Sequence, residues 1–183
     1  MSPQFSRDYT TGFESKWLEL LGQFAGKPNA MAIEIGCLEG RSSLWFLENI
    51  LTADTSRLMC IDPQFAPAFE QNISRHRARV QMIRSTSRVA LRDPALVFNS
   101  VDFIYIDGNH TAPFVLEDAI LAFPLLAKGG VMIFDDYLLQ SRWPHIPETM
   151  SKIAIDAFLA IYKSRLKLLH KDWQVAVEKT CLS

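Results

Sequence analysis

The sequence of 183 residues lacks a long apolar run and an excess of charge of one sign, and we expect no N-terminal leader. No segment is long and apolar enough to cross a bilayer, and residues 1–11 are polar without the charged-then-apolar order of a signal. The formal net charge is -1, so no overall field attracts nucleic acid or a membrane surface. We therefore expect a cytoplasmic protein that binds neither.

Cysteine is also scarce, with only Cys37, Cys60 and Cys181. No C-x-x-C pair is present, so a structural zinc site is not indicated. Cys37 and Cys60 fall in or beside expected strands and are predicted to be small buried residues in a reducing compartment. There is no internal repeat or low-complexity linker. We expect one domain over residues 1–183, with an N-terminal helical segment (1–29) before the core (30–183).

Apolar residues recur at the spacing of strands and helices in alternation. Helices are expected at 13–25, 43–51, 69–77 and 151–162. A further helix begins near Pro113 with a stripe that reaches Leu126; Pro124 kinks it or ends it early, and Lys128-Gly129-Gly130 stops it. Strands are expected at 30–35, 57–61, 80–83, 101–106 and 131–134, with a terminal hairpin of 166–169 and 174–177. This order predicts an α/β fold with a parallel sheet, helices on both faces and an added antiparallel strand.

The segment 34–42, EIGCLEGRS, joins the first expected strand to the next helix. A strand, a glycine turn and a helix form the place where doubly wound α/β folds bind a nucleotide-like cofactor. Gly36 lets the chain turn sharply, and Gly40 lets the backbone approach a ligand without a side chain in the way. A dinucleotide fingerprint needs glycine where Leu38 and Arg41 stand. Leu38 would obstruct a pyrophosphate and Glu39 would repel it, so the turn favours a cationic ligand over NAD; the alternative is an ordinary turn that binds nothing.

Acidic residues stand at the ends of most expected strands, where open α/β sheets bind their ligands. They are Glu34, Asp62, Asp107 and the pair Asp135-Asp136. Asp62 is placed to accept hydrogen bonds from ribose hydroxyls, or else to cap a turn before Pro63. Ser85, Thr86 and Ser87 follow the third strand, where they contact adenine or cap the next helix.

Three motifs carry a resemblance to a known family. The chain has E-x-G-x-x-x-G-x-S at 34–42, IDG-x-H at 106–110 and LL-x-x-GG-x-x-x-FDDY at 125–137. Together they resemble class I S-adenosylmethionine-dependent methyltransferases, in particular a bacterial IDG-x-H/FDDY family similar to the catechol O-methyltransferase-like branch. The resemblance extends from about residue 17 to 179. It implies a single-domain, Rossmann-like, seven-stranded methyltransferase sheet, but no particular substrate.

The resemblance also implies residue roles. S-adenosylmethionine, which carries a sulfonium and an ammonium group and no phosphate, is the expected cofactor. Its predicted binding residues are Glu34, Gly36, Gly40, Ser42, Asp62, Ser85, Ser87 and Asp107. Glu34 is expected both to order the glycine turn and to help hold the methionine end of the cofactor.

A divalent metal is a further implication. In the catechol branch an acid and an acid–amide pair bind magnesium, and the matching positions here are Asp107, Asp135 and Asp136. Carboxylates from strand ends about 4.8 Å apart can converge on Mg²⁺ or another oxygen-loving cation. Asp136 replaces the amide of that branch, so a different metal or none is an alternative. Without a metal the carboxylates would repel, and one could stay protonated.

His110 and Asp107 are the candidate catalytic residues, with His110 able to accept a proton near neutral pH or else to serve as a surface or capping residue. A loop with Trp143 and His145 either covers a substrate or packs on the sheet edge. We expect an enzyme that methylates a hydroxyl of a small molecule, with a metal assisting. The alternatives are a metal-free methyltransferase with His110 as base, and a cofactor-binding domain without catalysis. A homo-oligomer is left open, as is N-methylation.

Overall fold

Seven strands form the centre of the molecule. The computed structural model describes residues 3–140 and 146–182. The strands are β1 (Met31–Ile35), β2 (Arg57–Ile61), β3 (Val80–Ile83), β4 (Val101–Ile106), β5 (Leu126–Phe134), β6 (Leu166–Lys171) and β7 (Val175–Lys179). They lie in the order β3-β2-β1-β4-β5-β7-β6. The strands β1 to β5 run parallel to one another, whereas β7 is antiparallel to both β5 and β6. The predicted mostly parallel α/β sheet with a C-terminal antiparallel hairpin is confirmed.

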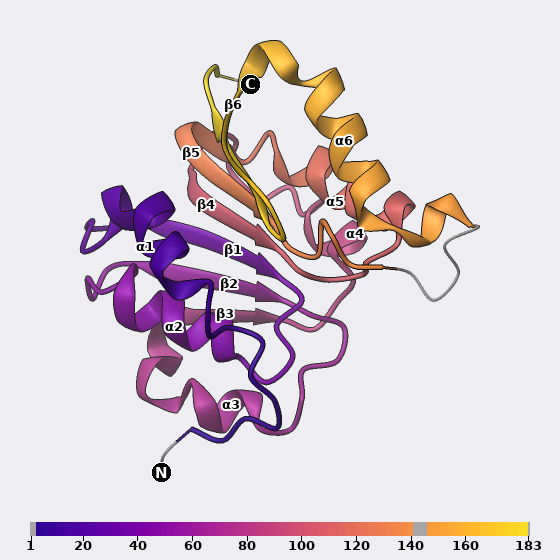
Figure 1. Cartoon of the computed structure of the whole chain (residues 1–183). Helices are drawn as coiled ribbons and strands as arrows, with labels where there is room; N and C mark the ends of the chain where they lie inside the picture. Colours follow the sequence, from indigo (N-terminus) through magenta and orange to yellow (C-terminus); the bar gives the residue numbers. More distant parts are fainter. Residues whose placement is uncertain (1–2, 141–145, 183) are drawn as a thin grey trace.

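Helices cover both faces of this sheet (Figure 1). One layer holds α1 (Glu14–Leu21), α2 (Arg41–Asn49) and α3 (Phe69–Asn72), and the other holds α4 (Ser87–Ala90), α5 (Ala112–Ala122) and α6 (Ser151–Ile161). Successive side chains of a strand point to opposite faces, so β1 contributes to two cores. Ile33 and Ile35 pack in the core that includes α5 and α6, whereas Ala32 packs in the core that includes α1 and α2.

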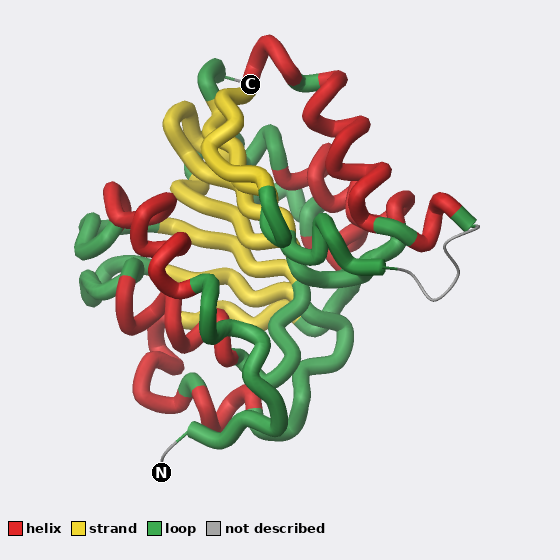
Figure 2. The backbone as a smooth tube through the Cα atoms, in the orientation of Figure 1, coloured by secondary structure: helices red, strands yellow, loops and turns green. Residues whose placement is uncertain are grey.

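The register of the parallel strands aligns their carboxyl ends. Ile35 pairs with Ile61 on one side and with Ile106 on the other, and Ile106 pairs with Phe134. The residues that follow these four are Gly36, Asp62, Asp107 and Asp135. They therefore leave the sheet at one edge, where Figure 2 shows the connecting loops gathered.

Several predicted elements have other bounds in the structure. The helix expected to reach Leu126 ends at Ala122, because Pro124 cannot continue it, and Leu126 already pairs with Val101 of β4. Lys128-Gly129-Gly130 therefore lies inside β5 instead of stopping a helix. The helix expected at 69–77 is divided into α3 and a 3₁₀ segment, Ser74–Arg79. The hairpin strands also end two residues later than predicted.

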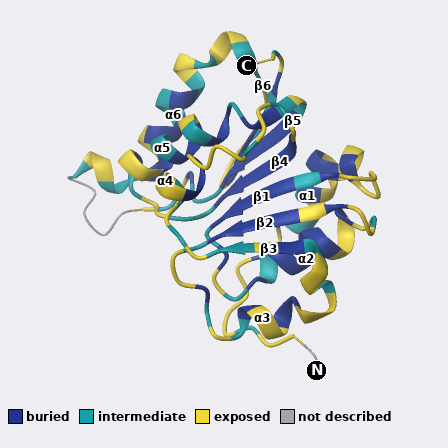
Figure 3. Ribbon diagram, turned by 180° about the vertical axis from the view of Figure 1, so that it is seen from behind, coloured by how far each residue is buried: buried dark blue, intermediate teal, exposed yellow. Residues whose placement is uncertain are grey.

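Burial separates the central strands from the edge. Every residue of β4 is buried, whereas every residue of β6 is half-buried or exposed, as the view from behind shows (Figure 3). Cys37 and Cys60 are buried free thiols, as predicted. In the two ranges that the structure describes, none of the helices has the length and apolar character needed to cross a membrane. The predicted roles of Trp143 and His145 fall outside the described residues.

Candidate functional site

A cleft of about 940 Å³ opens at the edge of the sheet where the parallel strands end. Most of the predicted site residues line it: Gly36, Ser42, Asp62, Ser87, Asp107, His110, Asp135 and Asp136. Glu34, Gly40 and Ser85 are not among its lining residues. The fold thus brings the glycine turn and the strand-end acids together, as the sequence predicts, but it gives three of the candidates other surroundings.

The two glycines of the turn are required by contacts within the protein. Gly36 has φ +83°, and a side chain there would collide with the backbone of Asp107. Because Gly36 has no side chain, the ends of β1 and β4 can approach each other. Gly40 has φ +79° at the start of α2, and a Cβ would lie 2.9 Å from the ring of Phe69. The space beside Gly40 is therefore filled by α3 and does not face the cleft, which corrects the reason predicted for this glycine.

Asp62 supports the glycine turn from the end of β2. Its Oδ2 accepts the backbone N–H groups of Cys37 (2.9 Å) and Leu38 (3.2 Å), and its Oδ1 accepts that of Gln64 (2.8 Å). These bonds hold Leu38 at φ +45°, a conformation that is uncommon for a residue with a side chain. Asp62 thus shapes the loop and also lines the cleft.

Glu34 lies beneath the turn and is fully buried. It shares the strand face of Ala32, so its carboxylate points under α2, where Ser42 and Ser43 each donate a hydroxyl hydrogen bond to it. Burial raises the pKa of Glu34 to about 7, although the two serine hydrogen bonds oppose this rise. Its observed contacts order the start of α2, in keeping with half of its predicted role. A contact with the methionine end of a cofactor stays a prediction.

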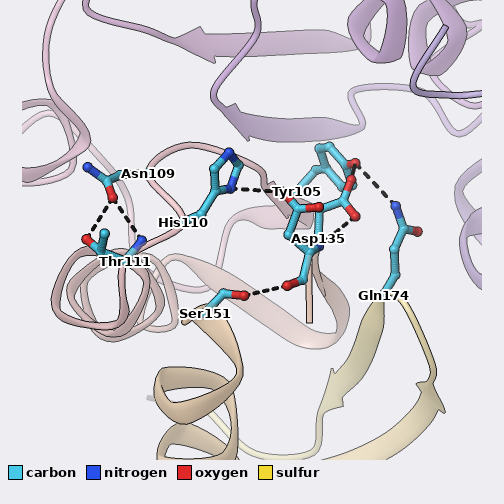
Figure 4. A network of polar contacts seen from close by, with 8 residues as sticks. Tyr105, Asn109, His110, Thr111, Asp135, Ser151 and Gln174 are labelled. Atoms are coloured by element: carbon cyan, nitrogen blue, oxygen red, sulfur yellow. Dashed lines mark hydrogen bonds and ion pairs between the residues drawn. The ribbon is translucent and has the colours of Figure 1, made fainter. Parts of the chain in front are cut away.

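The carboxylates Asp107, Asp135 and Asp136, which we call the acid cluster, follow β4 and β5. Figure 4 shows Asp135 held by its neighbours. The buried Tyr105 donates its hydroxyl to Asp135 Oδ2, and Oδ1 accepts the backbone N–H of Asp136 at 2.7 Å. Behind it, Gln174 of the C-terminal hairpin contacts the Tyr105 hydroxyl at 3.3 Å. Both carboxylate oxygens of Asp135 therefore accept hydrogen bonds from the protein itself.

Asp107 has far less support from the protein. Within residues 3–140 and 146–182 no side chain or backbone group is found to hydrogen-bond its carboxylate. Burial, together with the charges of Asp135 and Asp136, raises the pKa of Asp107 well above its usual range. The carboxylate is thus buried and close to other negatively charged groups, which favours its protonated form.

His110 contacts the acid cluster at Asp136, and its side chain is 48% exposed; Figure 4 shows this contact as a dashed line from its ring. Its Nδ1 contacts Asp136 Oδ2 at 2.9 Å, and this hydrogen bond raises its pKa above the ordinary value, against the effect of burial. Asp136 reaches it from a left-handed backbone conformation, φ +59°. The ligand atoms of Asp107, His110 and Asp136 lie within 4.8 Å of one another. This trio differs from the predicted metal set because His110 takes the place of Asp135.

Sequence reasoning missed three polar residues at the site. Tyr105 and Gln174 are buried beside Asp135, and Asp118 of α5 lines the cleft although it is only 3% exposed. Asp118 interrupts the apolar stripe of Val115, Ala119 and Ala122, and a charged residue on the buried side of a predicted helix is a signal that could have been used. Ser85 lies at the end of β3, outside the cleft, and only Ser87 of the predicted serine pair lines it.

Comparisons with known proteins agree with this geometry. A family model described as a methyltransferase domain matches residues 33–137, more than half of the chain. An uncharacterised protein of Acanthamoeba polyphaga mimivirus is 31% identical in an alignment 149 positions long, which covers 76% of this chain and 66% of the viral protein. The chain thus spans just under two thirds of that relative.

Solved structures share the fold at low identity. A supposed O-methyltransferase of Klebsiella pneumoniae has a TM-score of 0.74 and 15% identity, over 97% of this chain and 84% of that one. The MycE methyltransferase from the mycinamycin biosynthetic pathway, solved with Mg, SAH and mycinamycin VI, has a TM-score of 0.72 and 15% identity. The match covers 95% of this chain but 51% of MycE. At these identities the likeness shows the Rossmann-like methyltransferase fold alone.

Proposed function

The chain belongs to the methyltransferase domain family, and on this premise we propose that it transfers a methyl group from S-adenosylmethionine to a hydroxyl oxygen of a small molecule. The observation that carries the proposal is that the glycine turn and the acid cluster line the same cleft. One part suits a cofactor without phosphate, and the other suits the polar group that attacks its methyl.

The glycine turn and Asp62 form the proposed cofactor site. Asp62 Oδ1 accepts one backbone N–H, and a carboxylate oxygen has two lone pairs, so it can also accept a ribose hydroxyl. The positive sulfonium would lie toward the acid cluster, where the electrostatic field favours a cation. A pyrophosphate would be repelled there, which supports S-adenosylmethionine over NAD.

His110 is the proposed base, and it needs no further group to act. Asp136 binds Nδ1, so Nε2 is the ring nitrogen that would take the proton from the substrate hydroxyl. The Asp136 carboxylate would stabilise the imidazolium that forms. Asp107 lies beside both residues and would orient the hydroxyl for in-line attack on the methyl group, so that proximity supplies much of the rate.

A divalent cation also fits the donor set. Asp107, His110 and Asp136 offer two carboxylates and an imidazole within 4.8 Å of one another, and a dication would relieve the repulsion that raises the pKa of Asp107. A bound ion would hold the substrate hydroxyl and lower its pKa. With His110 as a ligand the ion would replace it as the activating group, so the metal-assisted and metal-free mechanisms are distinct alternatives.

Calorimetric titration tests the proposal directly. S-adenosylmethionine and its demethylated product are expected to bind, and NAD is not, both in Mg²⁺ and in chelator. Binding of NAD without binding of S-adenosylmethionine would overturn the proposal. Methyl transfer to a panel of small hydroxyl compounds then distinguishes the two mechanisms: full activity in chelator supports His110 as base, whereas loss of activity that Mg²⁺ restores supports the metal.

A further inference from the structure

One buried carboxylate in the cleft has no part in the function proposed above. Asp118 of α5 is 3% exposed and lines the cleft. Within the described part of the chain, its only hydrogen-bond partner is the Ser87 side chain at the start of α4. A carboxylate offers about four acceptor positions, so one serine hydroxyl leaves most of them unused in a place that is costly for a charge.

Asp118 comes from a different element than the acid cluster. It lies on α5 and takes its hydrogen bond from Ser87 after β3, whereas Asp107, Asp135 and Asp136 follow β4 and β5. We therefore assign Asp118 to the part of the cleft beside Ser87.

Two contacts show where Asp118 lies along the edge of the sheet. Ser87 follows β3, the edge strand two positions from β1 on the side away from β5. A Cβ built on Gly108 would lie 3.8 Å from Asp118 Oδ2, so the carboxylate also lies close to the backbone after β4. Along the strand ends, Asp62 stands between Ser87 and the glycine turn. A cofactor whose ribose binds Asp62 and whose methyl faces the acid cluster therefore has its base beside Ser87 and Asp118.

We infer that Asp118 accepts a hydrogen bond from the exocyclic amine of the cofactor's adenine and so selects adenine over other purines. This inference rests on the proposed function. An ionised carboxylate can only accept hydrogen bonds, and the exocyclic amine is the only donor on the adenine ring. Ser87 donates to the same carboxylate and holds it in place. Burial raises the pKa of Asp118 to about 6, so the group is ionised in an assay at pH 8.

The test compares S-adenosylhomocysteine with S-inosylhomocysteine, in which a carbonyl oxygen replaces the amine. By calorimetry at pH 8 the wild-type protein is expected to bind the adenine compound at least about tenfold more tightly, the factor expected for one hydrogen bond to a charged group. In Asp118→Asn the preference should fall to about threefold or less, because the amide can donate to the carbonyl as well as accept from the amine.

Glu117→Gln is the matched control. It removes one negative charge from the preceding position of the same helix, where the side chain forms ion pairs with Arg88 and Arg92, and it should keep the wild-type preference. Equal binding of the two compounds by the wild type, or an unchanged preference in a folded Asp118→Asn variant, would overturn the inference while leaving the proposed function in place. Failure of the wild type to bind S-adenosylhomocysteine at all would overturn both.

Discussion

The acids in and beneath the cleft differ in how many hydrogen bonds the protein itself donates to them. At the glycine turn, Glu34 accepts two serine hydroxyls and Asp62 accepts three backbone N–H groups. Asp107 and Asp118 have one protein partner between them in the described residues, the Ser87 side chain. Burying a carboxylate without hydrogen-bond donors costs free energy. A ligand that supplies donors therefore explains Asp107 and Asp118 better than a purely structural role does.

This difference assigns separate tasks to residues that look alike in the sequence. Glu34 and Asp62 shape the loop that would carry the cofactor, whereas Asp107 and Asp118 offer free acceptor positions. Asp135 belongs with the first kind, because Tyr105 and the backbone of Asp136 occupy its oxygens. Substitution of Glu34, Asp62 or Asp135 should therefore reduce stability. Substitution of Asp107 or Asp118 should instead change ligand binding or catalysis.

The largest effect is expected at Gly36. Gly36→Ala places a methyl group against the backbone of Asp107 at φ +83°, so we expect a loss of at least about 3 kcal/mol in the free energy of unfolding and no cofactor binding. Gly129→Ala is the matched control, since Gly129 has φ +81° with no atom near its missing Cβ. It should cost about 1 kcal/mol. Urea denaturation measures both free energies of unfolding. Equal losses in the two variants would show that the close approach of β1 and β4 does not exclude a side chain at position 36.

In the acid cluster, His110→Ala should reduce the rate while leaving the fold intact. If His110 is the base, kcat in chelator should fall by about 10² to 10⁴. Because Asp136 raises the pKa of His110, activity should rise with pH through a midpoint above 6.5, and in Asp136→Asn this midpoint should move down toward 6.5. His170→Ala, on edge strand β6 outside the cleft, is the control and should change neither quantity. An unchanged kcat in His110→Ala would exclude it as the base.

Glu34 provides a pH test of the satisfied acids. Its folded-state pKa of about 7 exceeds the ordinary 4.5, so the folded state binds the proton more tightly. Stability is therefore highest below pH 4.5 for this group and falls as the pH rises to about 7, by about 3 kcal/mol. Other raised acids act in the same direction, so the measurement is the difference between wild type and Glu34→Gln in urea denaturation at several pH values. A difference that does not change across this range would contradict the buried, protonatable Glu34.

The sequence was sufficient for the architecture because the sheet depends on local patterns. β2, β3 and β4 have the predicted bounds, and their register brings the strand-end acids into one row. The surroundings of each side chain depended on packing between distant segments. Phe69 fills the space beside Gly40, and Gln174 approaches Tyr105 from the C-terminal hairpin. Neither contact follows from a motif. The alternation along β1 could have revealed that Glu34 shares the face of Ala32 and points under α2.

Asp62 both supports the glycine turn and lines the cleft, and the smallest effect is expected for its substitution. Asp62→Asn keeps one carbonyl oxygen but replaces the other with a donor, so at least one of the N–H bonds from Cys37, Leu38 and Gln64 is lost. If Asp62 only supports the turn, stability should fall by about 1 kcal/mol and cofactor affinity should follow only slightly. If it also holds the ribose, affinity should fall by about tenfold for S-adenosylhomocysteine but little for a fragment that lacks the ribose, such as adenine. Calorimetry with the two ligands separates these outcomes, because damage to the turn would not depend on whether the ligand carries ribose hydroxyls.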